Sequence, residues 1–277
     1  MNNALQPGAP IGVFDSGVGG LSVLRALRAQ LPQEDFVYLS DAAHAPYGER
    51  SEDYVGARAL RLADFLLERH GVKALVLACN TATAAAVHAL RARWPTLPII
   101  GIEPALKPAA SASQTGLVGV MATRSTLQSS KFKSLLDSLQ GHARFVLQPC
   151  DGLAAAIEEG DAKATRGLCA RYTNEMGGFG SLSGQIDQLV LGCTHYPLVG
   201  DLLQGLVGPA TALVDPGAPV SLQTRRVLAQ AGLLRTGQTA GTTLLLSTGS
   251  GDALHRNAQR WLGLHQSVGS ACTDPPP

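Results

Sequence analysis

Short apolar runs alternate with longer amphipathic stretches through the N-terminal half of the chain. The runs are continuous and rich in Val, Ile and Leu, which is typical of strands buried on both faces of a sheet. Between them, the apolar residues recur at helical spacing, as in the stretch from Ser51 to His70. Strand and helix in strict alternation predict a parallel sheet with helices on both faces. The predicted strands cover residues 10–17, 36–41, 73–79 and 98–104.

The same pattern then begins again in the middle of the chain. TGLVGVMATRST at 115–126 resembles PIGVFDSGVGG near the N-terminus, because each is an apolar strand followed by small polar residues. Further strands are predicted at 143–150 and 188–193. The restart indicates a duplicated α/β unit with pseudo-symmetry.

Beyond Asp215 the pattern adds a few more elements. It predicts a helix over 220–231, a strand over 242–248 and a helix over 252–262. The last residues, SVGSACTDPPP, are small, polar or Pro, so we expect a disordered tail in which Cys272 has no role.

Composition narrows the class of protein. A 45% hydrophobic and 16% charged chain is too apolar for intrinsic disorder, and a net charge of +1 gives no strong field toward nucleic acid or membranes. The sequence shows neither a signal peptide nor a span long enough for a bilayer. Five cysteines, without C-x-x-C spacing, favour reduced thiols over disulfides or zinc. We therefore expect a cytoplasmic protein.

Two of the cysteines stand in matching places. Cys79 in LVLACNTATA and Cys193 in LVLGCTHYPL each follow a Leu-Val-Leu run and precede hydroxyl, amide or imidazole groups. A single cysteine of this kind is often only a small buried hydrophobe. Two in equivalent positions can instead place a thiol on each face of a substrate carbon. One thiolate would remove a proton while the other thiol delivers one, and the result is inversion at that carbon.

Polar groups at other strand ends could assist this chemistry. Asp15 and Ser16 follow the first strand, and His195 lies two residues after Cys193. Each could also be structural, as a turn cap or a hydrogen-bonded core histidine. DSGVGGL lies where phosphate loops occur, but it lacks the GxGxxG and GK[ST] spacings. A turn rich in N–H donors beside Asp15 suits a small zwitterion better.

Four motifs in order resemble a known family: FDSGVGGLSVL, DAAHAPYGER, LACNTATA and LGCTHYPL. Together they resemble the glutamate racemases, a cofactor-independent branch of the aspartate/glutamate racemase superfamily, over about residues 10–262. The resemblance implies two similar α/β domains related by a pseudo-two-fold axis, with the active site in the cleft between them. The first domain is expected at 1–104 plus 215–277, and the second at 105–214.

The resemblance also implies roles for individual residues. Cys79 would take the α-proton from D-glutamate and Cys193 the α-proton from L-glutamate, with Asp15, His195 and Glu158 assisting; Glu159 is an alternative to Glu158. The residues expected to bind substrate are Asp15, Ser16, Pro46, Tyr47, Gly48, Asn80, Thr81, Thr123, Thr126 and Thr194. Asn80 and Thr81 could equally cap a helix, and Pro46-Tyr47-Gly48 could be an ordinary turn.

By this resemblance we expect a racemase that interconverts L- and D-glutamate and supplies D-glutamate for peptidoglycan synthesis. It would need no cofactor or metal; no lysine for pyridoxal phosphate lies in the motifs. Its partner would be glutamate, not nucleic acid or membrane, and it could form a homodimer. Open alternatives are an aspartate racemase, a binding protein that keeps the cleft, and a metal–thiolate protein.

Overall fold

The computed structural model describes residues 5–273, which fold into two compact units. The first unit comprises the residues up to Ile102 together with those from Gly217 onward, and the second comprises Glu103–Pro216. Each unit is built on a parallel sheet, so the predicted class of two parallel-sheet α/β domains is confirmed. Within 5–273, no helix is both long and apolar enough to cross a membrane.

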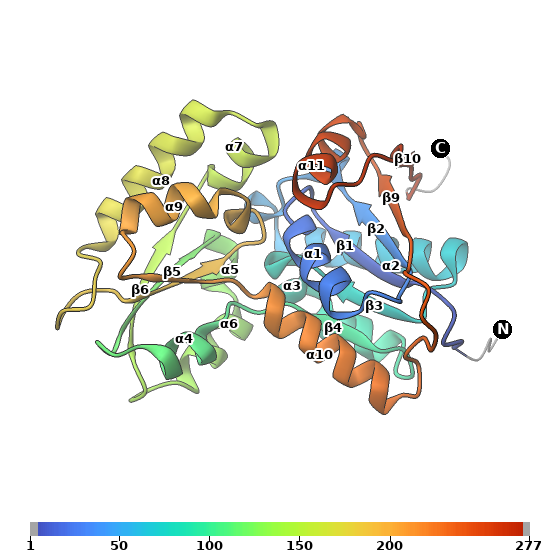
Figure 1. Ribbon diagram of the computed structural model, residues 1–277, viewed down its shortest axis with the longest axis horizontal. Helices are drawn as coiled ribbons and strands as arrows, with labels where there is room; N and C mark the ends of the chain where they lie inside the picture. Colours follow the sequence, from blue (N-terminus) through green and yellow to red (C-terminus); the bar gives the residue numbers. More distant parts are fainter. Residues whose placement is uncertain (1–4, 274–277) are drawn as a thin grey trace. The chain divides into compact units, whose positions relative to one another are not determined.

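In the first unit, a six-stranded sheet has the order β10-β9-β2-β1-β3-β4 (Figure 1). All of its strand pairs are parallel. Helices α1, α10 and α11 pack together, and α2 packs on α3. The elements are β1 Ile11–Asp15, α1 Leu21–Gln30, β2 Phe36–Ser40, η1 Ala42–His44, η2 Tyr47–Glu49, α2 Glu52–His70, β3 Ala74–Leu77, α3 Asn80–Arg93, β4 Ile99–Gly101, α10 Gly217–Gln230, β9 Thr243–Ser247, α11 Asp252–Leu262 and β10 Gly269–Ser270.

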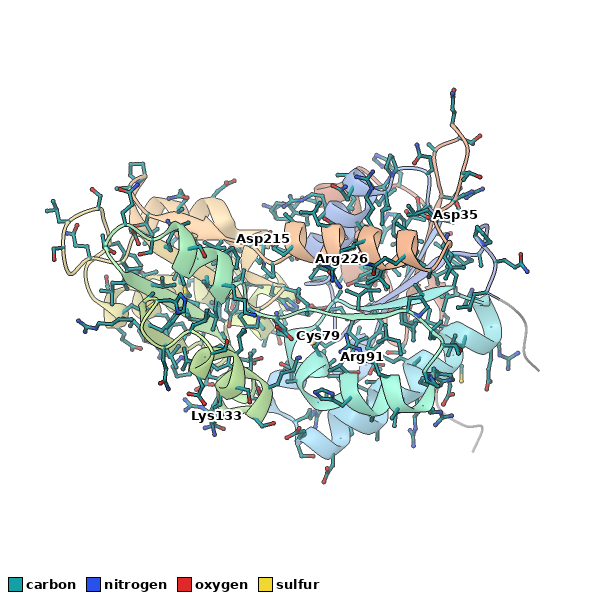
Figure 2. All side chains as sticks on the ribbon, turned by 90° about the horizontal axis from the view of Figure 1, so that it is seen from below. Asp35, Cys79, Arg91, Lys133, Asp215 and Arg226 are labelled. Carbon is teal, nitrogen blue, oxygen red and sulfur yellow. The ribbon has the colours of Figure 1, made fainter. Side chains whose placement is uncertain are left out.

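Local signals explain where these helices begin and end. The Ser51 hydroxyl caps α2 by accepting from the Tyr54 amide, and Gly71 ends the helix in the left-handed conformation that glycine tolerates. Figure 2 labels Arg91, in the last turn of α3; its guanidinium donates to the carbonyl of Ile99 at 3.0 Å. This bond ties the end of α3 to the start of β4.

The second unit has a four-stranded parallel sheet in the order β6-β5-β7-β8. In Figure 1, α7, α8 and α9 lie on one side of this sheet, and α4 and α6 lie on the other. The elements are α4 Leu106–Ala112, β5 Leu117–Ala122, α5 Arg124–Gln128, α6 Ser130–Asp137, β6 Arg144–Pro149, α7 Leu153–Glu159, α8 Ala162–Met176, β7 Gln188–Gly192, η3 Tyr196–Val199, α9 Gly200–Val207 and β8 Ala212–Val214.

The strand order repeats between the units. In the first sheet β1 lies between β2 and β3, with β4 beyond β3; in the second, β5 lies between β6 and β7, with β8 beyond β7. Strand β3 therefore corresponds to β7. These are the strands that Cys79 and Cys193 follow, so the two thiols occupy equivalent positions in a repeated topology.

The expectation of a disordered C-terminal tail is wrong for residues 267–273. Strand β10 extends the first sheet by pairing with β9, and the Ala271 amide donates to the Ser247 carbonyl at 2.8 Å. Ala271 is buried because it packs into the core beneath this edge. Cys272 is exposed, and residues 274–277 lie outside the described residues.

Asp187 anchors the loop that leads into β5. Its carboxylate accepts from the Ser113 hydroxyl at 2.6 Å and from the amides of Gln114 and Thr115 at 2.6 and 3.1 Å. Burial alone would raise the pKa of Asp187, but these hydrogen bonds outweigh it and lower the pKa below its ordinary value. The group therefore stabilises the fold at pH values above the unfolded-state pKa, and this contribution is lost as the pH falls through the lower folded-state pKa.

Replacing Asp187 by Asn is expected to lower the free energy of unfolding by about 1.5–3 kcal/mol at pH 7, because bonds to a charged acceptor are lost. Urea unfolding measures this loss. The difference from the wild type should shrink as the pH falls below about 4. Asp137→Asn, at an exposed position of the same unit, is the control and should change little. Equal stability of Asp187→Asn and the wild type at pH 7 would contradict the stabilising role of these hydrogen bonds.

Candidate active site

In the first unit, the predicted site residues gather at the carboxyl end of the sheet. Strand order reverses at β1, since β2 lies on one side of it and β3 on the other. In open parallel sheets, ligands bind beyond the strand ends at such a switch point. Asp15 ends β1, and Cys79 follows β3, whose Leu77 is in register with Phe14. The switch point thus carries a carboxylate and a thiol on neighbouring strands.

Cys79 caps helix α3. Its sulfur accepts from the amide of Ala82 at 3.4 Å and lies 4.0 Å from the Ser16 hydroxyl oxygen. Figure 2 shows the residue at the N-terminus of that helix. Unpaired N–H groups and the helix dipole favour negative charge there. The position therefore suits a thiol that must carry charge as thiolate, and its side chain is largely buried.

Asn80 and Thr81 form the first turn of α3 and are also buried. The prediction left open whether Asn80 is a helix cap; the cap is Cys79 instead. Within the described part of the chain, neither Oδ1 nor Nδ2 of Asn80 has a hydrogen-bond partner. Burying an amide without a partner is costly, so this side chain is ready to pair with a polar ligand.

The DSGVGG turn holds Asp15 in place. The Asp15 carboxylate accepts from the Gly17 amide at 2.8 Å, and the Tyr38 hydroxyl donates to the Gly17 carbonyl at 2.7 Å. Gly20 lies against both groups. A Cβ on Gly20 would come within 2.6 Å of Asp15 Cβ and 2.8 Å of the Tyr38 hydroxyl oxygen, so only a glycine fits.

Gly20→Ala is therefore expected to displace Asp15 and to lower both stability and activity. Overpacking of this kind costs about 1–3 kcal/mol in unfolding free energy. The control is Gly56→Ala in α2, where the nearest atom to an added Cβ is the Ala85 carbonyl oxygen at 3.7 Å. That variant should gain about 0.5–1 kcal/mol. Urea unfolding compares the stability of the two variants, and a Gly20→Ala protein as stable as Gly56→Ala would contradict the packing argument.

Tyr47 and Gly48 begin η2, and Pro46 precedes them after a cis Ala45–Pro46 peptide bond. Tyr47 is almost fully buried, and its hydroxyl donates to the Asp41 carboxylate at 2.5 Å. The segment is therefore a turn whose central side chain is buried and hydrogen-bonded, and its role in substrate binding stays a prediction. Asp41 was not among the predicted site residues, although it directly follows β2 and so lies at the same edge of the sheet.

In the second unit, the structure brings Cys193, His195 and Glu158 together. Cys193 Sγ lies 3.7 Å from His195 Nδ1, and His195 Nε2 lies 2.7 Å from Glu158 Oε2. Glu158 reaches the histidine from α7, whereas the neighbouring Glu159 is exposed. The thiol on one side and the carboxylate on the other together orient the imidazole of His195, as in other sites where a third group holds a base in place.

His195 is buried, and its environment favours the charged form. Burial lowers the pKa of His195, but the hydrogen bonds and negative charges of Cys193 and Glu158 outweigh it and raise the pKa well above its ordinary value. The imidazolium is thus available to stabilise a Cys193 thiolate or to pass a proton to it.

The predicted threonines of this unit lie near the same strand ends. Thr123 follows β5 and caps α5, because its hydroxyl oxygen accepts from the Thr126 amide at 3.2 Å. The Thr123 hydroxyl also donates to that of Thr126 at 2.9 Å. Thr194 is buried beside Cys193. Thr123 therefore has a capping role that the sequence did not indicate, and the part of Thr123 and Thr126 in substrate binding stays a prediction.

The second unit also buries two further thiols and a tyrosine. Burial raises the pKa of Cys169 to about 11 and raises that of Cys150 further. The Cys150 thiol donates to the Gln148 carbonyl oxygen at 3.4 Å. These thiols stay protonated at neutral pH. Tyr196 is fully buried, and burial together with the charges of Cys193 and Cys150 raises the pKa of its hydroxyl well above the ordinary value. Sequence patterns did not single out Tyr196, although it belongs to the CTHYP motif.

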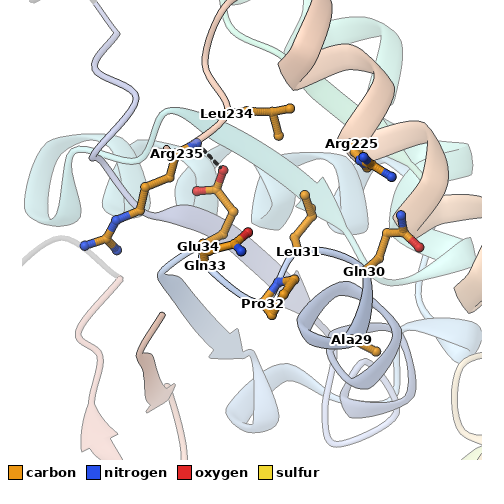
Figure 3. Close-up of a pocket in the computed structure, with 9 residues that line it drawn as sticks. All are labelled: Ala29, Gln30, Leu31, Pro32, Gln33, Glu34, Arg225, Leu234 and Arg235. Atoms are coloured by element: carbon orange, nitrogen blue, oxygen red, sulfur yellow. Dashed lines mark hydrogen bonds between the residues drawn. The ribbon is translucent and has the colours of Figure 1, made fainter. Parts of the chain in front are cut away.

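A separate cavity of about 380 Å³ lies at the opposite, amino-terminal side of β2 (Figure 3). Its lining residues are Ala29, Gln30, Leu31, Pro32, Gln33, Glu34, Arg225, Leu234 and Arg235. Glu34 is already paired there, since it accepts from Lys73 Nζ at 2.5 Å and from the Arg235 amide at 2.8 Å. None of the predicted site residues, all within the described range, lines this cavity, so we place the chemistry at the strand ends.

Comparison with known proteins identifies the family of the chain. A family model for Asp/Glu/Hydantoin racemase matches residues 11–219. A glutamate racemase of Ectopseudomonas mendocina is 50% identical over 246 residues, which cover 88% of this chain and 91% of that protein. The chain therefore belongs to the Asp/Glu/hydantoin racemase family and is an enzyme of the racemase class, an isomerase. The resemblance predicted from the four motifs is confirmed.

Two solved structures are similar over nearly their whole length. The glutamate racemase of Francisella tularensis, in complex with D-glutamate, has a TM-score of 0.81 at 27% identity, with 97% of this chain and 99% of that chain covered. The glutamate racemase of Escherichia coli, in complex with L-glutamate and an activator, has a TM-score of 0.82 at 28% identity, with 95% and 98% covered.

Proposed function

We propose that the protein is a glutamate racemase that moves the α-proton of glutamate between two thiols, without a cofactor. The observation that carries this proposal is the equivalent placement of Cys79 and Cys193 after corresponding strands of a repeated topology. The 50% identity to a named glutamate racemase and the two neighbours that hold the two enantiomers of glutamate support the substrate.

The two thiols lie in different units, so the mechanism requires one glutamate molecule to contact both. Cys79 removes the α-proton from D-glutamate, and Cys193 delivers a proton to the opposite face; from L-glutamate the roles reverse. Asp15 assists on the Cys79 side. On the other side, His195, oriented by Glu158, exchanges protons with Cys193.

The difficult step is removal of a proton from an unactivated α-carbon. Carbanionic charge that develops there needs preorganised donors and a site that excludes water. The buried Asn80 amide, the hydroxyls of Ser16, Thr81 and Thr194 and nearby backbone amides are suited to bind the carboxylates and the ammonium group. Pro46, Tyr47 and Gly48 complete the first-unit wall, and Thr123 and Thr126 add hydroxyls in the second.

D-glutamate made in this way would serve peptidoglycan synthesis, in the cytoplasm of a bacterium. The enzyme could act as a homodimer, and we propose domain boundaries of 1–104 plus 215–277 for the first domain and 105–214 for the second.

A substrate panel tests the proposal. Circular dichroism should show loss of optical activity with L- or D-glutamate, and far slower loss with the aspartate enantiomers. Preference for aspartate would make the protein an aspartate racemase. Inactivity toward both amino acids, from a folded sample, would overturn the proposal.

A further inference from the structure

The hydroxyl of Tyr47 stands at the end of a buried chain of polar groups. It donates to Asp41 Oδ2, which also accepts from Arg58 Nε at 3.1 Å. Asp41 Oδ1 accepts from Arg58 Nη2 at 2.8 Å and from the Thr248 hydroxyl at 2.9 Å. Arg58 therefore binds both carboxylate oxygens through two neighbouring nitrogens on one edge of its guanidinium, and the Tyr47 hydroxyl depends on the orientation of that carboxylate.

This ion pair is out of contact with water. The exposed fractions of Asp41, Arg58 and Tyr47 are 0%, 2% and 1%. A buried ion pair is a poor source of net stability, because both charges must be desolvated. A bidentate Arg–carboxylate pair does, however, fix geometry closely, since the planar fork permits little rotation of either group. Its contribution here is a defined direction for the oxygen that receives the Tyr47 proton.

Tyr47 in turn belongs to the surroundings of Cys79. Both side chains are part of one buried cluster, and η2, which carries Tyr47, packs against α3, which Cys79 caps. Burial, followed by the charge and hydrogen bond of Asp41 and the charge of Cys79, raises the pKa of Tyr47 far above its ordinary value. Its hydroxyl thus stays neutral and continues to donate to Asp41 when Cys79 is a thiolate.

The C-terminal segment holds Arg58, at the other end of this hydrogen-bonded network. The Thr273 hydroxyl oxygen accepts from Arg58 Nη2 at 2.7 Å. Thr273 is held there because β10 pairs with β9 and Ala271 is bonded to Ser247. The same guanidinium group therefore contacts both the strand-end carboxylate and the last described residue of the chain.

We propose that Arg58 is a positioning residue for the Cys79 half of the racemisation: through Asp41 it fixes the Tyr47 hydroxyl in the wall beside Cys79, and the C-terminal segment secures it through Thr273. This inference rests on the proposed function and goes beyond it, because none of the four motifs that mark the family contains Arg58 or Thr273. If the contacts of Arg58 are weakened, the Tyr47 hydroxyl beside Cys79 moves from its position. Small displacements at a reacting centre slow proton transfer.

The experiment compares Arg58→Lys with a matched control, Arg93→Lys. Lysine keeps the positive charge but loses the fork. The control makes the same change, guanidinium to ammonium, at Arg93. This residue forms an exposed ion pair with Asp64 that joins α3 to α2 in the same unit. With Arg58→Lys, kcat/KM for glutamate should fall by about 10-fold, in a folded protein, whereas Arg93→Lys should match the wild type.

Deuterium isotope effects separate positioning from general loosening. Because enantiomers are equal in free energy, kcat/KM is the same in both directions, but each direction breaks its C–H bond at a different thiol. If Arg58→Lys slows transfer at Cys79, the isotope effect on kcat/KM should rise with D-[α-²H]glutamate and fall toward one with L-[α-²H]glutamate. A purely structural defect would leave both isotope effects at their wild-type values.

Thr273→Val provides the milder variant in case Arg58→Lys does not fold, because it removes only the hydroxyl acceptor at the end of the chain. It should shift the two isotope effects in the same directions, with a decrease in kcat/KM of about 2-fold. A wild type that does not racemise glutamate would end the proposed function itself. A wild type that does racemise glutamate, with folded variants whose two isotope effects both stay at the wild-type values, would overturn only the role of Arg58.

Discussion

Replacing Cys193 by Ala is expected to lower kcat/KM for glutamate racemisation by about 10⁴-fold, at the upper end of what general acid–base catalysis contributes. The reason is that Cys193 is the only proton donor or acceptor proposed for one face of the α-carbon. Cys79→Ala should cause a loss of the same order, because neither direction can be completed with one thiol. Circular dichroism of either enantiomer measures both variants.

Cys272→Ala is the control for these two variants, since Cys272 is exposed and lies at the C-terminal end of the sheet edge. It should keep wild-type activity. If Cys193→Ala is folded and still racemises glutamate within about 10-fold of the wild type, general acid–base catalysis by Cys193 is wrong.

Replacing Glu158 by Gln is expected to lower kcat/KM by roughly 10²-fold and to move its alkaline limb to lower pH. The carboxylate of Glu158 helps to raise the pKa of His195, so its loss brings that pKa down. A group with a raised pKa keeps its proton up to that pKa and loses it as the pH increases further. Activity that depends on the imidazolium must therefore decline at a lower pH in the variant. A pH profile of kcat/KM measures the shift.

Glu159→Gln is the matched control, because it makes the same chemical change at the adjacent, exposed position. It should leave both the rate and the alkaline limb unchanged. A shift with Glu159→Gln but not with Glu158→Gln would show that the hydrogen bond of 2.7 Å between His195 and Glu158 has no part in the reaction.

Hydrophobic periodicity predicted the elements that are long or continuously apolar. The strands β1, β2, β3, β5 and β7 are buried, mostly apolar runs, which need no tertiary information to be recognised. The elements that were missed are short. Helix α7 has only seven residues, three of them alanines, and β8 has three residues, so neither repeats its apolar pattern often enough to be recognised.

Strand β10 was mistaken for a disordered tail because small polar residues dominate it. Its two residues are ordered by pairing with β9, a contact that local composition does not reveal.

Some residues of the candidate site could likewise be predicted from the sequence, and others could not. Cys79 and Cys193 could be found from sequence because each repeats the same strand-end context in a duplicated pattern. Glu158 was reached only by resemblance, since it is distant in sequence from His195. Arg58 and Asp41 were not predicted at all. Their role depends on a hydrogen-bond network that brings together β2, α2 and the C-terminal segment, and such a network follows from the folded structure alone.

Incubation of L-glutamate with the purified protein in D₂O tests the two-thiol mechanism most directly. Proton NMR follows the α-proton, and separation of the enantiomers shows which molecules carry deuterium. Early in the reaction, the D-glutamate formed should contain deuterium at the α-carbon, while the remaining L-glutamate keeps its proton, because removal and delivery occur at different thiols. D-glutamate that retains the original α-proton, or L-glutamate that exchanges as fast as it inverts, would contradict the mechanism.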